Sequence, residues 1–99
     1  MYFKTKEEAI HELREMACPF ARRMVRIFKE FEFTYHDDTE PPDKNKLLSA
    51  LNDLIKFVAE DGKDDSEVRS GRFTVGCEYN NESGYLPIMR MEIDAEDTL

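Results

Sequence analysis

The chain has 99 residues, the size of one domain, and its 40% of apolar residues can form one packed core. The chain has 14 lysines and arginines and 22 aspartates and glutamates, so its net charge is −8 at pH 7. A chain this acidic repels nucleic acid at long range. No apolar run reaches the roughly 18 residues that cross a membrane, and two cysteines are too few for a disulfide framework.

The first predicted element is a helix that begins after Thr5. Thr5 and Glu8 have the spacing of a capping box, in which the two side chains bond to backbone N–H groups at a helix start. Apolar residues then recur at alternating spacings of three and four from Ile10 to Phe31, which indicates one apolar stripe. Pro19 interrupts the backbone hydrogen bonds in the middle, but the stripe keeps its phase on both sides. The pattern therefore predicts one kinked helix.

A short strand, a loop and a second helix are expected next. Residues 31–36, FEFTYH, alternate aromatic and polar side chains, as a strand with one buried face does. Residues 37–43, DDTEPPD, have the aspartates and prolines of a loop. From about residue 43 to residue 60 a leucine-rich stripe predicts a helix, which Gly62 is placed to end.

The last third of the chain is predicted to form a β-hairpin. Residues 63–71, KDDSEVRSG, are expected to be a polar connection. Residues 72–79 and 85–93 then alternate in the manner of two strands joined by a tight turn. Pro87 cannot donate to a strand ladder, so the second of these strands is expected at an edge. Residues 94–99 are expected to be a frayed acidic tail.

These elements predict a single α+β domain over residues 1–99. Its parts are a kinked N-terminal helix, a short strand, a second helix and a C-terminal β-hairpin. The three strands are expected to form an antiparallel sheet with the helices on one face. The other face is expected to be open to water, and these residues line it: Glu32, Thr34, His36, Thr74, Glu78 and Arg90.

The carboxylates are concentrated on the predicted connections and the tail, and this favours a protein-binding role. Anionic loops steer a cationic protein into contact and can occupy the groove in which it would hold phosphate. In charge and size alone, the chain is similar to small acidic inhibitors of nucleic-acid enzymes and to immunity proteins against nuclease toxins. We therefore expect an interaction module, not an enzyme, that binds and inhibits a basic protein, such as one that handles nucleic acid. The residues expected to bind it are Asp37, Asp38, Glu40, Asp43, Asp61, Asp64, Asp65 and Glu67, with Tyr35, Tyr79 and Tyr85 as aromatic anchors.

Two alternatives stay open. In the first, Cys18 is a reactive thiol of a redox sensor or enzyme, because a helix restarting at Pro19 and the nearby Arg22 would stabilise its thiolate. His11 is about 10 Å away along a helix, and burial as a small apolar residue is the commoner fate of a cysteine. In the second, the chain is a structural homodimer, without a ligand, through the edge strand 85–93. Cys77 is expected in the core.

Metal and cofactor chemistry is not expected. Glu8 and His11 match a Glu-x-x-His unit, but a di-iron site needs a second copy that the chain lacks. His36 with Asp37 and Asp38 falls short of a closed zinc set. His11 is better explained as an exposed partner of carboxylates one turn away.

Direct nucleic-acid binding and secretion are not expected either. The cations near the end of the first helix suit the negative end of the helix dipole: Arg22, Arg23, Arg26 and Lys29. The N-terminal residues MYFKTKEEAIHE lack the apolar segment of a signal peptide and are too acidic for a transit peptide. With two cysteines in all, the chain is expected in the cytoplasm.

Overall fold

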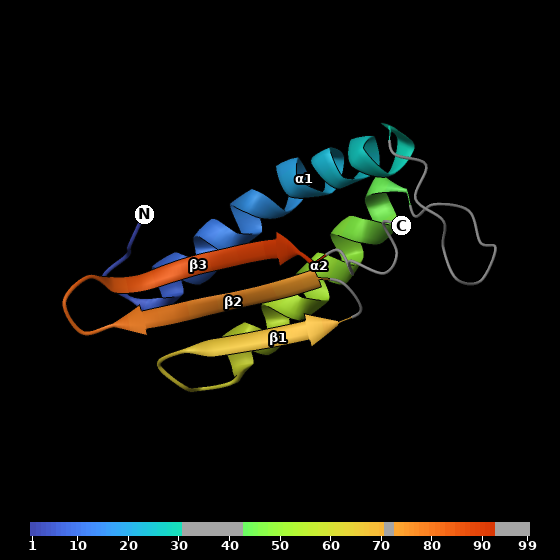
Figure 1. The fold of residues 1–99 in the computed structure, drawn as a ribbon. Coiled ribbons are helices and arrows are strands. Elements are labelled where there is room, and N and C mark those ends of the chain that lie inside the picture. The colour runs from blue at the N-terminus through green and yellow to red at the C-terminus, as the bar shows by residue number, and fades with distance from the viewer. Residues whose placement is uncertain (31–42, 71–72, 93–99) are drawn as a thin grey trace.

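The computed structural model describes residues 1–30, 43–70 and 73–92, which form two helices and a three-stranded antiparallel sheet (Figure 1). The predicted α+β class is therefore confirmed. Three expected features, the strand at 31–36, most of the loop at 37–43 and the tail at 94–99, lie outside the described residues. The elements in chain order are α1 (Lys6–Glu30), α2 (Lys44–Glu60), β1 (Ser66–Ser70), β2 (Phe73–Asn80) and β3 (Gly84–Met91).

Helix α1 begins where the capping box predicts. The backbone N–H of Glu8 donates to Thr5 Oγ1 at 3.2 Å, and Glu7 and Glu8 place negative charge at the positive end of the helix dipole. The helix continues through Pro19 to Glu30, which confirms one helix instead of two. The bend expected at Pro19 stays a prediction. The apolar stripe is buried at Ala9, Ile10, Leu13, Ala17, Phe20, Ala21 and Met24.

Helix α2 has a start and an end that the sequence predicts. Asp43 is the N-cap, with φ −77° and ψ 171°, and its Oδ1 accepts a hydrogen bond from the backbone N–H of Lys46 at 2.8 Å. Asp61 caps the other end, and Gly62 follows with φ +72°, the left-handed conformation that commonly ends a helix. The predicted stripe is buried at Leu47, Leu51, Leu54, Ile55 and Val58.

The sheet has the order β1-β2-β3. The predicted hairpin is confirmed, because β2 pairs with β3 in a register that places Val75 opposite Met89. On its other side β2 pairs with β1, and Val68 lies opposite Val75. Pro87 lies in β3, an edge strand of this sheet, as its missing N–H predicts. In Figure 1, the first turns of α1 pass behind β3 and the rest of the helix extends beyond it, while α2 runs behind β2 and β1.

Strand β1 corrects the sequence analysis, which treated residues 63–71 as a polar connection. Val68 is the only apolar residue in its sequence, SEVRS, so hydrophobic alternation gives no signal. Ser66 is nevertheless only 8% exposed, because hydrogen bonds to Lys6 and Asp61 satisfy its hydroxyl group. A polar network replaces apolar burial at the start of this strand.

One cluster of buried side chains joins α1, α2 and β2. Val75 and Cys77 of β2 belong to it, as predicted for Cys77, and Val68 and Phe73 pack against it. Phe20 of α1 meets Phe73 edge to face, with ring centroids 6.1 Å apart and planes at 72°. The sheet face that carries these residues is called the core face below, and the opposite face is called the outer face.

The N-terminal residues hold the start of α1 against the start of β3. Phe3 and Tyr85 exchange two backbone hydrogen bonds of 2.7 Å each. Gly84 precedes Tyr85 with φ +101°, and a Cβ atom at this position would overlap the carbonyl oxygen of Phe3. The close approach and the positive φ both require glycine here.

Candidate functional site

The structure describes seven of the eleven residues expected to bind a partner, and they do not form one surface. Tyr35, Asp37, Asp38 and Glu40 lie outside the described residues. Asp43 caps the start of α2, so its carboxylate is used within the helix. The loop with Asp61, Asp64 and Asp65 lies at the other end of α2, about 25 Å away along the helix axis.

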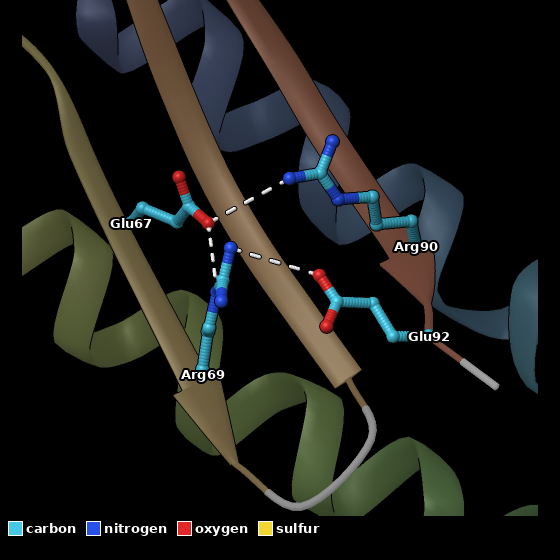
Figure 2. A network of polar contacts seen from close by, with 4 residues as sticks. All are labelled: Glu67, Arg69, Arg90 and Glu92. Atoms are coloured by element: carbon cyan, nitrogen blue, oxygen red, sulfur yellow. Dashed lines mark hydrogen bonds and ion pairs between the residues drawn. The ribbon is translucent and has the colours of Figure 1, made fainter. Parts of the chain in front are cut away.

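Glu67 lies on the outer face of β1 in a network of four charged residues (Figure 2). Its Oε1 accepts a hydrogen bond from Arg69 Nε at 3.2 Å and lies 3.8 Å from Arg90 Nη2. Arg69 Nη2 in turn lies 3.6 Å from Glu92 Oε1. Two arginines therefore offset the charge of Glu67, which leaves it less available to a cationic partner than the loop carboxylates.

The network crosses the middle strand over two small residues. Thr74 has Arg69 as its register partner in β1 and Arg90 in β3, and it is only 1% exposed. Thr74 was expected to be open to water, and this expectation is wrong. Gly76 lies opposite Glu67, and a Cβ on it would stand 3.0 Å from the carbonyl oxygen of Ser66. The missing side chain allows β1 to lie close to β2.

A second polar network holds the loop between α2 and β1. Lys6 Nζ donates to the carbonyl oxygen of Lys63 at 2.6 Å and to Ser66 Oγ at 2.9 Å. Ser66 Oγ donates to Asp61 Oδ2 at 2.8 Å. One oxygen of the Asp61 carboxylate is therefore occupied, and the loop is tied to the start of α1.

Three of the predicted site residues lie together at the end of the hairpin: Tyr79, Tyr85 and Asp64. The two rings have centroids 4.9 Å apart, and Tyr85 Oη donates a long hydrogen bond of 3.5 Å to Asp64 Oδ1. The pKa of Tyr85 is raised, first because burial disfavours the phenolate and then because the Asp64 carboxylate is close. Tyr79 is 41% exposed, so part of its side chain is open to solvent.

The sequence analysis missed Phe57, which is 61% exposed on α2. Asp53, Glu60 and Asp61 stand four residues before, three after and four after it, so these carboxylates flank the ring on the helix surface. The spacing of residues along α2 could have identified Phe57 from the sequence, because Phe57 lies outside the stripe of Leu54, Ile55 and Val58. An aromatic residue out of phase with the core stripe faces water.

We call the second half of α2 and the loop that follows, residues 53–65, the acidic segment. It contains five carboxylates and two lysines: Asp53, Glu60, Asp61, Asp64 and Asp65, with Lys56 and Lys63. Asp53, Glu60 and Asp65 are exposed, and none of them makes an ion pair with a residue that the structure describes.

The remaining titratable groups show little chemistry of their own. Burial raises the pKa of the Cys77 thiol. Cys18 is half-buried in α1, and no hydrogen bond joins it to another described side chain. His11 Nε2 lies 3.7 Å from Glu15 Oε1, which confirms that it is an exposed partner of a carboxylate. Within residues 1–30, 43–70 and 73–92, no group of three possible ligands could hold a metal ion.

Comparison of the chain with protein-family models, with curated proteins and with solved structures found no match. Neither described helix is long and apolar enough to cross a membrane. The binding properties of the acidic segment therefore follow from its own side chains. Exposed carboxylates accept charge-assisted hydrogen bonds, and an aromatic face attracts cations.

Proposed function

We propose that the chain is a non-enzymatic module that binds a basic protein through the acidic segment. One observation carries this proposal. Phe57 is an exposed aromatic residue with Asp53 and Glu60 beside it, and these carboxylates make no ion pair with a described residue. A large apolar ring costs free energy in water, and its burial by a partner would recover that cost.

An arginine or lysine side chain is the ligand that suits this surface. Its cation can lie over the Phe57 ring while its N–H groups donate to neighbouring carboxylates. Tyr79 supplies a second exposed ring at the end of the hairpin, where Asp64 and Tyr85 meet. Aromatic residues of this kind carry much of the affinity of protein interfaces because they bury a large area at low entropic cost.

Inhibition of the partner follows from the sign of the charge. A protein that handles nucleic acid has a basic groove, and exposed carboxylates such as Asp53 and Glu60, about two helical turns apart on α2, can take the place of phosphates in it. The net charge of −8 steers such a protein toward the chain and keeps nucleic acid itself away. Cytoplasmic location and the absence of direct nucleic-acid binding are part of the same proposal.

Affinity capture with matched charge variants tests the proposal. The bait is the full chain, used in a nuclease-treated cell extract, and the variant is Asp53→Lys, Glu60→Lys and Asp65→Lys together. The control carries the same change of charge at other exposed sites, as Glu15→Lys, Glu78→Lys and Glu82→Lys. We expect the wild type and the control to retain a set of basic proteins, and we expect the variant not to retain them. Added nucleic acid should displace these proteins from the wild type. Retention by the variant at wild-type level would contradict the proposal.

A further inference from the structure

A cleft of about 470 Å³ opens between α1, the loop after α2 and the start of β3. Lys6, Ile10 and Arg14 line one side at intervals of four residues, so they follow one line along α1 for about 12 Å. Lys63 and Tyr85 contribute to the other side. The volume lies within the roughly 300–1,000 Å³ of small-molecule sites.

The lining of the cleft has a net positive charge, opposite in sign to the charge of the whole chain. Three cations line it, Lys6, Arg14 and Lys63, against the two carboxylates of Glu7 and Asp64, whereas the whole chain has 14 basic and 22 acidic residues. Arg14 and Lys63 make no ion pair with any residue of the described ranges. A cationic cleft in an acidic chain is a place where a small anion gains electrostatic energy.

The walls of this cleft are held in place before any ligand arrives. Lys6 Nζ is fixed by hydrogen bonds of 2.6 Å to the Lys63 carbonyl and 2.9 Å to Ser66 Oγ, which leaves one of its three N–H donors unused by these contacts. The backbone of Tyr85 is fixed by its two hydrogen bonds to Phe3, and its Oη donates to Asp64 Oδ1 at 3.5 Å. Ordering this part of the wall costs little binding free energy, whereas the exposed side chains of Arg14 and Lys63 lose freedom when they bind a ligand.

We infer that this cleft binds a small organic carboxylate. Arg14 and Lys63 hold the carboxylate group, which matches the planar fork of a guanidinium, and the apolar body of the ligand packs against Ile10 and the Tyr85 ring. A dianionic phosphate ester loses more hydration than a monoanion on entering the cleft, and Glu7 and Asp64 offset most of the positive charge that would compensate for this loss, so we expect a monoanion to bind better. The cleft shares Lys63 and Asp64 with the acidic segment but does not include Asp53, Phe57, Glu60 or Asp65, so the inference does not depend on the proposed protein partner.

A matched set of small ligands tests the inference by NMR. The full chain, labelled with ¹⁵N, is titrated with phenylacetate, with its neutral analogue phenylacetamide and with phenyl phosphate. We expect saturable shifts of the Ile10, Lys63 and Tyr85 amides with phenylacetate, a weaker effect with phenyl phosphate and no saturation with phenylacetamide. Equal binding of the amide, tighter binding of phenyl phosphate, or shifts that do not map to the cleft would overturn the inference.

Variants decide which cations act. Arg14→Gln and Lys63→Gln are changes at exposed side chains, and each is expected to weaken phenylacetate binding about tenfold, as loss of a charge-assisted hydrogen bond does. Arg22→Gln with Arg23→Gln, on the same helix outside the cleft, is the control and should leave Kd unchanged. If both glutamine variants bind as the wild type does, the cleft is not the carboxylate site. The variant Asp53→Lys, Glu60→Lys, Asp65→Lys should still bind phenylacetate, whatever the outcome of the capture experiment.

Discussion

Lys6 and Ser66 are 60 positions apart in the chain, and their side chains meet, because Lys6 Nζ donates to Ser66 Oγ at 2.9 Å. Ser66 Oγ in turn donates a hydrogen bond to Asp61 Oδ2 at 2.8 Å. The contact joins the start of α1, the end of α2 and the start of β1, and it links Asp61 of the acidic segment to Lys6 of the cationic cleft. One polar network thus positions both candidate sites.

Replacement of Ser66 by alanine should destabilise the protein by about 1–2 kcal/mol, because Lys6 and Asp61 each lose a hydrogen-bond partner in a partly buried network. Urea unfolding followed by circular dichroism measures the change. Ser70→Ala at the exposed end of the same strand is the control, and it should stay within about 0.5 kcal/mol of the wild type. Equal effects of the two variants would show that the network contributes nothing.

Gly84→Ala should cost far more than Gly62→Ala, although both glycines have positive φ. At Gly62 nothing lies within 4 Å of an added Cβ, so only the backbone strain of about 1 kcal/mol remains. At Gly84 the added Cβ overlaps the Phe3 carbonyl and must break its pairing with Tyr85, for a total above about 3 kcal/mol. Thermal and urea unfolding of the two variants give the comparison, and similar midpoints would contradict it.

Local signals made much of this fold predictable from the sequence, and the missing parts depend on contacts between distant residues. The cap at Asp43, the leucine stripe and Gly62 define α2 within one stretch of chain. The hairpin turn places Tyr79 opposite Tyr85, so their contact follows from the predicted strands. Strand β1 could not be found in this way, because its burial depends on the contact of Ser66 with Lys6.

The candidate site was predictable in part for the same reason. Glu67 was taken as a loop carboxylate, and its pairing with Arg69 and Arg90 becomes visible only when β1, β2 and β3 are in register. Phe57 was within reach of sequence analysis, since its position off the stripe of α2 is a local property. An aromatic residue that lies off the buried stripe of a helix can therefore be identified from the sequence, as charge can.

Close packing should outweigh surface charge on the outer face. Glu67→Gln removes ion pairs between exposed side chains and should change the free energy of unfolding by less than about 1 kcal/mol. Gly76→Ala should cost about 1–3 kcal/mol, because its Cβ would stand 3.0 Å from the Ser66 carbonyl, a backbone atom that cannot move alone. Denaturant unfolding of both single variants checks the order, and a larger loss from Glu67→Gln would reverse this account.

The buried thiol of Cys77 should make stability fall at alkaline pH. Its pKa is raised above 9.0 in the folded protein, chiefly by burial, so the folded state keeps its proton where the unfolded state loses it. The contribution to stability is complete below pH 9 and is lost as the pH rises through the folded pKa. Cys77→Val should flatten the fall in the free energy of unfolding that begins near pH 9. Parallel pH profiles for wild type and Cys77→Val would contradict the assignment.

The most direct test of the acidic segment is the affinity of the full chain for a fluorescein-labelled nona-arginine peptide, measured by anisotropy. Asp53→Asn, Glu60→Gln and Asp65→Asn together should raise Kd about tenfold, and Phe57→Ala should raise it about threefold. The control Glu15→Gln, Glu78→Gln, Glu82→Gln loses the same charge elsewhere and should stay within about twofold. If the two triple variants weaken binding equally and Phe57→Ala has no effect, the peptide responds to net charge alone, and the acidic segment is not a binding site.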